Sequence, residues 1–205
     1  MELISSDVQD IEFMRLAIAE ARKAGSLDEV PIGAVVVRDG EVIAVAYNRR
    51  EIDADPAGHA EFIAMKQASN KLGVWRLSGC TVYVTLEPCI MCAGLMHQAR
   101  IDRCVFGAFD PKAGALGSLY QVNADERLNH VFEVTPGVCE EECASLLQTF
   151  FREKRKRNKA RKAAARAEEA NEPAAAKPLT ALAPLCSRRQ LPSAFGWDAK
   201  CLSTL

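Results

Sequence analysis

Two cysteines three residues apart, Cys89 and Cys92, have the types and spacing that most clearly indicate chemistry. They follow Pro88, and because proline is tolerated in the first turn of a helix, both cysteines are expected on one face of a helix start. Backbone N–H groups and the positive end of the helix dipole favour thiolate over thiol there. Two adjacent thiolates at such a position can bind a cation.

The best candidate for a third ligand is His59, in the segment Gly58-His59-Ala60-Glu61. Apolar residues recur at helical spacing after it, so His59 is also expected at a helix start. One imidazole and two thiolates leave a fourth tetrahedral position for water, as in a catalytic zinc site. The pattern therefore predicts one Zn2+ per chain bound by His59, Cys89 and Cys92. Glu61, two residues after His59, is placed to reach that water.

Each of the two motifs also has an ordinary interpretation. A lone Cys-x-x-Cys in a cytosolic protein can be a redox pair or half of a structural zinc site. A lone His-x-Glu is usually an ordinary helix start. Together, in this order and each at a predicted helix start, the two motifs favour a catalytic zinc site.

The surrounding chain must supply a scaffold that brings these two helix starts together. Hydrophobic periodicity predicts helices that alternate with strands after an initial hairpin, in which Asp39-Gly40 forms the turn. This order indicates an α/β protein, a three-layer α/β/α sandwich with a mixed five-stranded sheet. The expected helices cover residues 8–25, 59–73, 89–99 and 139–156, and the expected strands cover 30–37, 41–47, 80–86, 102–108 and 130–135.

Positive charge is concentrated in residues 152–166, which contain nine Lys or Arg residues and one acid. The rest of the chain contains 17 basic and 26 acidic residues, a net charge of −9. Such a distribution is expected of a phosphate-binding arm on an acidic body. The alternative is the solvated end of a helix.

The composition bounds the class of protein. A chain of 205 residues with 49% apolar residues suits one domain with a real core and a tail. The N-terminus has neither a basic segment nor an apolar one, and no uncharged run is long enough to span a membrane. We therefore expect a cytoplasmic protein with no membrane partner, whose eight cysteines are reduced thiols.

Longer stretches around the two motifs resemble the bacterial tRNA-specific adenosine deaminases, a family of cytidine-deaminase-like zinc enzymes. The resemblance is carried by residues 29–35, Glu-Val-Pro-Ile-Gly-Ala-Val, by His59-Ala-Glu61, by residues 83–94 and by residues 105–108. It covers about residues 8–158, which implies a zinc-dependent deaminase domain with the cytidine-deaminase-like fold. Residues 159–205, first rich in Ala and charge and then containing Pro, extend beyond it and are expected to form a disordered tail. Its first part, residues 159–176, can be helical but has no apolar stripe to bury.

The resemblance implies hydrolytic deamination of adenosine to inosine at the wobble position of a tRNA anticodon, by a zinc-activated water, with Glu61 as the catalytic acid–base group. It also implies the tRNA anticodon arm as partner and a homodimer as the active form. A small and apolar helix face, residues 93–96, is suited to such an interface. The positions implied to contact the nucleotide or the anticodon loop are Asn48, Val30, Pro31, Leu86, Asp110, Lys112, Phe150, Phe151 and Arg152.

Two other function classes stay open. A zinc-dependent deaminase of a free nucleobase or nucleoside, such as guanine, cytosine or adenosine, shares the zinc motif but has no use for a basic RNA-binding helix. A non-catalytic RNA-binding subunit would have no need of Glu61.

Overall fold

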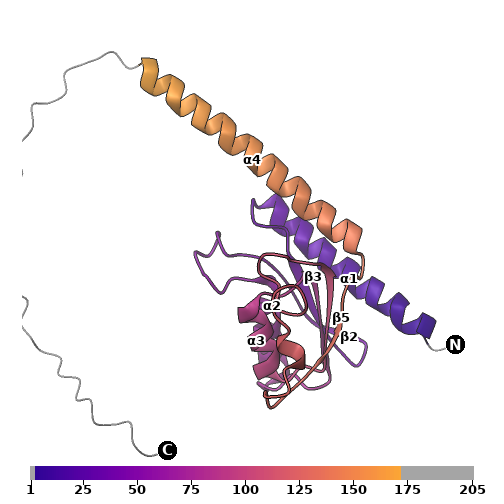
Figure 1. The fold of residues 1–205 in the computed structure, drawn as a ribbon. Coiled ribbons are helices and arrows are strands. Elements are labelled where there is room, and N and C mark those ends of the chain that lie inside the picture. The colour runs from indigo at the N-terminus through magenta and orange to yellow at the C-terminus, as the bar shows by residue number, and fades with distance from the viewer. Residues whose placement is uncertain (1–2, 172–205) are drawn as a thin grey trace, which may run out of the picture. The chain divides into compact units, whose positions relative to one another are not determined.

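The computed structural model describes residues 3–171, which form three layers (Figure 1). A mixed five-stranded sheet lies between helices on both of its faces, so the expected α/β/α sandwich is confirmed. The helices are α1 (Leu3–Ser26), α2 (Ala60–Leu72), α3 (Ile90–Ala99) and α4 (Glu140–Asn171), with a short 3-10 helix η1 (Val122–Ala124). The strands are β1 (Gly33–Arg38), β2 (Glu41–Tyr47), β3 (Cys80–Leu86), β4 (Arg103–Ala108) and β5 (Glu133–Thr135).

The sheet has the strand order β2-β1-β3-β4-β5. β1 is antiparallel to β2 and β3, whereas β3, β4 and β5 run parallel. The β1–β2 hairpin turns at Asp39 and Gly40, both of which have positive φ, 52° and 78°. Two successive positive φ angles are typical of a type I′ turn, which fits the twist of a hairpin.

Side chains of the central strands alternate between two apolar cores. Val36 and Val82 belong to the core beneath α2 and α3, whereas Val35 belongs to the core beneath α1 and α4. The first core is the larger and includes Met65 and Met96. Figure 1 shows α2 and α3 on one side of the sheet and α1 with α4 on the other. The sheet is thus covered on both faces, as expected when strands are apolar along their whole length.

Two glycines allow helices on the α1/α4 face to approach the sheet closely. A Cβ atom at Gly33 would lie 2.0 Å from the carbonyl oxygen of Ala17 in α1. A Cβ atom at Gly107 would lie 2.4 Å from Sγ of Cys143 in α4. Any larger residue at either position must push a helix away from its strand.

The start of β1 differs from the prediction, because residues 30–32 are not part of the strand. The backbone N–H of Ile32 donates to the carbonyl of Val30 (2.8 Å), which closes a tight turn, and β1 begins at Gly33. Pro31 has no N–H to donate to a neighbouring strand, which explains why the ladder cannot include it. β5 is also shorter than predicted, three residues in place of six.

The last helix is longer than predicted, because α4 continues from Lys156 to Asn171. Residues 159–171 are therefore helical, in line with the expectation that residues 159–176 can form a helix. Ala, Lys, Arg and Glu have high helix propensity, which explains a helix without an apolar stripe. Residues 172–205, to which the rest of that prediction applies, lie outside the described residues. Within residues 3–171, none of the helices combines the length and apolarity that crossing a membrane requires.

Candidate active site

The site is built where two helices on the same face of the sheet begin. His59 is the N-cap residue of α2, and Cys89, directly after Pro88 at the end of β3, is the N-cap residue of α3. Both have extended backbone angles, and neither side chain makes a hydrogen bond that caps its own helix. Neither N-cap position has the Ser, Thr, Asp or Asn that commonly accepts a hydrogen bond from the backbone N–H groups of a helix start. The side chains of His59 and Cys89 are therefore available for other contacts.

The donor atoms of His59, Cys89 and Cys92 lie within 4.8 Å of one another. Nδ1 of His59 is 3.6 Å from each of the two Sγ atoms. A tetrahedral site with zinc–sulfur bonds of about 2.3 Å and zinc–nitrogen bonds of about 2.05 Å requires a nitrogen–sulfur separation of about 3.6 Å. The three side chains therefore fit a tetrahedral zinc ion. Among residues 3–171, no other such group of His, Cys, Asp or Glu side chains is close enough to hold a metal.

The three groups already influence one another's protonation. Hydrogen bonds from Cys92 and His59 lower the pKa of Cys89 to about 3. The hydrogen bond to Cys89 raises the pKa of Cys92, and that between His59 and Cys89 raises the pKa of His59. A divalent cation binds the deprotonated form of each group, so its binding releases protons from this cluster.

Glu61 lies in the first turn of α2, two residues after His59, and its side chain is buried. Burial raises the pKa of its carboxyl group, against the opposing effect of hydrogen bonds from its own backbone N–H and from Cys92. A raised pKa makes the carboxylate a stronger base, which favours uptake of a proton. A carboxyl group with a raised pKa thus lies beside the three donor atoms.

A cavity of about 540 Å³ opens above these residues. This volume is in the usual range for a small-molecule site. Of the residues singled out from the sequence, those that line it are Val30, Asn48, His59, Glu61, Leu86, Cys89, Asp110, Lys112 and Phe151. Cys92 is fully buried next to them. Residues outside the predicted set of site residues also line the cavity, namely Ile32, Arg50, Glu87, Phe109, Ala113, Leu147 and Arg155.

Three residues expected at the substrate line other cavities. Pro31 is buried and, with Phe150, lines a cavity of about 630 Å³ that α1 and α4 border. Arg152 lines a third cavity, of about 550 Å³, together with Asp110 and Lys112. Asp110 and Lys112 also line the 540 Å³ cavity next to His59 and Glu61, so the 550 Å³ cavity adjoins it. Arg152, Pro31 and Phe150 do not line the 540 Å³ cavity.

The model of one deaminase family, the MafB19-like deaminases, matches residues 8–155. The chain belongs to this family. Among curated relatives, the tRNA-specific adenosine deaminase of Bacillus subtilis is 53% identical over 152 residues, 74% of this chain and 94% of that protein. That of Haemophilus influenzae is 45% identical over 155 residues, 75% of this chain and 90% of that protein. The expected resemblance to these deaminases is thus confirmed.

Solved structures agree with the family assignment. A protein described as a tRNA:A34 deaminase, which edits A to I at the wobble position, is 47% identical with a TM-score of 0.65. The match covers 66% of this chain and 99% of that one. A guanine deaminase from Nitrosomonas europaea, 24% identical with a TM-score of 0.60, covers 68% of this chain and 83% of that one. At this identity, the second match shows only that the fold is shared.

In this deaminase, Glu87 fixes the loop that forms one wall of the cavity. Its buried carboxylate accepts hydrogen bonds from the backbone N–H groups of Asp110 (3.0 Å), Leu116 (3.1 Å) and Ser118 (3.0 Å), and from the Ser118 hydroxyl. Gly114 passes so close that a Cβ atom there would lie 2.2 Å from Oε2 of Glu87. The sequence showed only an acid before Pro88; the loop that returns to it is visible only in the fold.

Glu87 is expected to stabilise the deaminase in a pH-dependent way. Burial opposes its ionisation, but the hydrogen bonds from Ser118, Asp110 and Leu116 lower its pKa overall below the ordinary 4.5. Its stabilisation is therefore fully present above about pH 4.5 and is lost as the pH falls through the lower pKa of the folded state. Glu87→Gln places an N–H group among N–H donors, which should cost roughly 1–3 kcal/mol of unfolding free energy at pH 7.

Urea unfolding of wild type and Glu87→Gln between pH 3 and pH 7 checks this prediction. The stability difference should be largest at neutral pH and should shrink in acid. Glu126→Gln, which changes an exposed carboxylate, is the control. A difference that does not depend on pH would show that the charge of Glu87 is not what holds the loop.

Proposed function

We propose that this protein is a zinc-dependent hydrolase that converts adenosine to inosine at the wobble position of a tRNA anticodon. The observation that carries the proposal is the His59, Cys89 and Cys92 donor set, spaced for a tetrahedral zinc ion beside buried Glu61. The names of the relatives supply the substrate class.

The reaction consumes one water and releases one ammonia. A zinc ion held by His59, Cys89 and Cys92 supplies Lewis acidity, which lowers the pKa of a water molecule toward about 7. Glu61 takes a proton from water and delivers it to the purine nitrogen next to the amine-bearing carbon. A new C–O bond forms at that carbon. Glu61 then takes the second proton of the water, from the new hydroxyl group, and gives it to the departing amine as the C–N bond breaks.

The cavity supports a flipped purine as substrate. Apolar side chains of Val30, Ile32 and Leu86 provide surfaces for the two faces of a base, and Asn48 provides hydrogen-bonding groups. Phe109 and Phe151, 45% and 41% exposed, also line the cavity. Exposed aromatic rings stack with unpaired RNA bases, so these two residues are suited to bases that flank the target.

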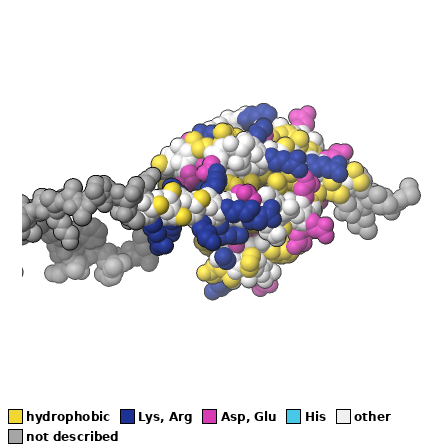
Figure 2. Space-filling view, turned by 90° about the horizontal axis from the view of Figure 1, so that it is seen from above, with side chains coloured by type: hydrophobic (Ala, Val, Ile, Leu, Met, Phe, Trp, Pro, Cys, Tyr) yellow, Lys and Arg dark blue, Asp and Glu magenta, His cyan; other side chains and the backbone are white. Residues whose placement is uncertain are grey.

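Basic side chains of α4 lie where an RNA backbone would approach. Arg155 lines the cavity, and Arg152 lines the adjoining one with Lys112. Figure 2, which views the face that bears α4, shows dark blue Lys and Arg side chains along this helix. Other members of the basic run are engaged within the chain: Arg157 pairs with Asp28, and Lys154 lies 5.1 Å from the centre of the Phe150 ring. Arg152 pairs only loosely with its exposed neighbour Glu153 (3.6 Å), so Arg152 and Arg155 are the best candidates for phosphate contacts.

The double variant Arg152→Gln, Arg155→Gln is expected to bind an anticodon stem-loop more weakly and with less dependence on salt. Each lost phosphate contact lowers the log–log salt slope by roughly 0.7–0.9, so the slope should fall by about 1.4–1.8. Binding titrations at several salt concentrations measure this slope. Arg161→Gln, Lys162→Gln makes the same charge change further along α4 and is the control. Equal slopes for the two double variants would mean that the basic run is only a solvated helix end.

The substrate is tested by mass spectrometry of nucleosides from an anticodon stem-loop incubated with the pure protein. Inosine at the wobble position is the expected product. Deamination of free guanine, cytosine or adenosine with no change in the RNA would favour the free-base alternative. Binding without any deamination would indicate a non-catalytic subunit.

The proposal includes a homodimer that uses the outer surface of α2 and α3. Ala93 and Met96 of the predicted interface are fully buried in their own chain, so only Gly94 and Leu95 are left for a partner. Leu95 lines an apolar cavity of about 430 Å³ with Trp75, which is 61% exposed. Light scattering is expected to give twice the chain mass, and Trp75→Lys to give monomers. A wild-type monomer with full activity would contradict the dimer.

We also place the enzyme in the cytoplasm, where thiolate ligands stay reduced.

A further inference from the structure

The carboxylate of Glu29 is fully buried, with 0% of the residue exposed, in the loop between α1 and β1. Within residues 3–171 it pairs with no Lys or Arg side chain. Oε1 accepts hydrogen bonds from the backbone N–H groups of Glu51 and Ile52, both 2.7 Å. Oε2 accepts one from Nδ2 of Asn48 (2.8 Å). A buried charge without a cation needs such donors, so Glu29 and the segment 48–52 fix each other.

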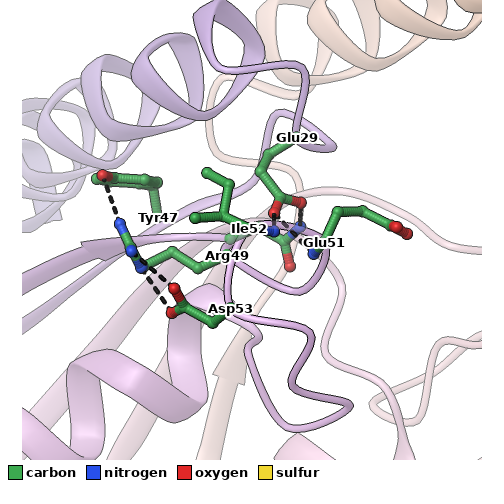
Figure 3. A network of polar contacts seen from close by, with 7 residues as sticks. Glu29, Tyr47, Arg49, Glu51, Ile52 and Asp53 are labelled. Carbon is green, nitrogen blue, oxygen red and sulfur yellow. Dashed lines mark hydrogen bonds and ion pairs between the residues drawn. The ribbon is translucent and has the colours of Figure 1, made fainter.

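The far side of the same loop is fixed independently. The guanidinium group of Arg49 donates two hydrogen bonds to Asp53, both 2.8 Å, and one to the hydroxyl of Tyr47 (2.9 Å). Figure 3 shows Glu29 directed at the backbone of Glu51 and Ile52, and Arg49 extended between Tyr47 and Asp53. The loop that begins with Asn48 is thus held in place before any substrate enters.

This contact determines which way the amide of Asn48 points. A carboxylate can only accept hydrogen bonds, so the group of Asn48 that faces Glu29 must be the amide nitrogen. One N–H and the carbonyl oxygen Oδ1 of Asn48 are then left for a ligand in the cavity that Asn48 lines. An amide with one free donor and one free acceptor matches the N7 acceptor and the N6–H donor of adenine. Hypoxanthine, with an oxygen at C6, would place an acceptor against Oδ1.

We propose that Glu29 is a positioning residue for base recognition: it fixes the amide of Asn48 so that the cavity accepts a 6-aminopurine. The inference rests on the proposed function, because it assumes an adenine in the cavity. Glu29 touches neither the base nor the three metal-ligand candidates; it acts through Asn48. This role also explains why the buried acid Glu29 directly precedes the apolar segment of residues 30–37.

Glu29→Gln changes this arrangement without changing its size. The glutamine oxygen must face the two backbone N–H groups of Glu51 and Ile52, which leaves its NH2 group toward Asn48. Asn48 must then rotate its amide and offer Oδ1 to residue 29. Its two N–H groups would face the cavity, and one of them would oppose the N6–H of adenine. The variant should therefore deaminate adenosine at least tenfold more slowly at subsaturating RNA.

The test pairs this variant with a substrate that lacks N7. Wild type, Glu29→Gln and Asn48→Ala are given a stem-loop carrying either adenosine or 7-deazaadenosine at the wobble position, and kcat/KM is measured for each pair. Removal of N7 should cost wild type roughly tenfold and should cost Glu29→Gln and Asn48→Ala little beyond their own losses. The intrinsic reactivity of 7-deazaadenosine cancels, because every enzyme is compared on both substrates.

If removal of N7 lowers kcat/KM by the same factor in Glu29→Gln as in wild type, the inference is overturned, because Glu29 then acts independently of N7. If Glu29→Gln fails to fold, Asn48→Ala decides: an undiminished effect of N7 removal in that variant would also overturn it. A wild-type protein that leaves the adenosine stem-loop unchanged would overturn the proposed function as well. Independent losses on an active wild type overturn only the role of Glu29.

Discussion

Glu61→Gln is expected to lower the rate of adenosine deamination by roughly 10²–10⁴-fold, the usual contribution of a general acid–base group. Glutamine keeps the size and polarity of the side chain but cannot carry the proton from water to the purine and on to the amine. Glu61 is not among the three donors that lie together, so zinc content and RNA affinity should stay at wild-type values. Single-turnover rates at saturating RNA, with elemental analysis of the same sample, measure both.

Glu141→Gln is a matched control for this variant. Glu141 is the second residue of α4, as Glu61 is the second residue of α2, but Glu141 is exposed. Both changes remove an acid that favours the positive end of a helix dipole, so a loss of rate confined to Glu61→Gln isolates proton transfer. A Glu61→Gln rate within tenfold of wild type would exclude Glu61 as the main proton carrier.

The second large effect is expected from Cys89→Ala, which should remove most of the bound zinc and with it the activity. Wild type should contain about one zinc per chain, because the donor set can be completed only by all three side chains. Loss of one thiolate leaves two donors, and Cys92 and His59 alone cannot close a stable site. Zinc is measured by elemental analysis after dialysis against a weak chelator.

Cys80→Ala provides the comparison for the cysteine variant. Cys80 is buried at the start of β3, whereas Cys89 follows the end of the same strand, so only one of the two variants loses a metal-ligand candidate. Burial raises the pKa of the Cys80 thiol, which disfavours the thiolate that a metal needs. Full zinc occupancy in Cys89→Ala would require a different ligand set.

Much of this protein could be predicted from local patterns. The His59 and Cys89 helix starts, the hairpin turn at Asp39-Gly40 and the mixed sheet follow from signals a few residues long. The prediction failed at residues 30–32, where an apolar run outweighed the missing N–H of Pro31. Composition indicated that residues 159–176 can be helical, and α4 continues into this segment as far as Asn171, with no helix-breaking residue before Pro173.

The composition of the cavity was harder to predict, because it depends on how elements meet. Leu147, Phe151 and Arg155 follow one another at four-residue spacing and share the helix face that lines the cavity. Phe150 and Arg152 lie one residue away and line other cavities. A run that is basic on all sides gives no sign of which face is turned to the sheet. Glu29 and Glu87 were missed because their hydrogen-bond donors come from loops distant in sequence.

The close contact between Gly107 and Cys143 links the packing of the core to the position of the α4 side chains that line the cavity. A helix transmits a tilt as a stiff rod, and each residue adds about 1.5 Å to its length. Phe151 and Arg155 lie about 12 Å and 18 Å further along α4 than Cys143. A small rotation of α4 about Cys143 therefore displaces these two side chains by a larger distance at the cavity. A methyl group at position 107, as in Gly107→Ala, would push Cys143 and the α4 helix away from β4. Under the proposed function, a substitution at position 107 is therefore expected to change the affinity for RNA, although Gly107 does not line the cavity.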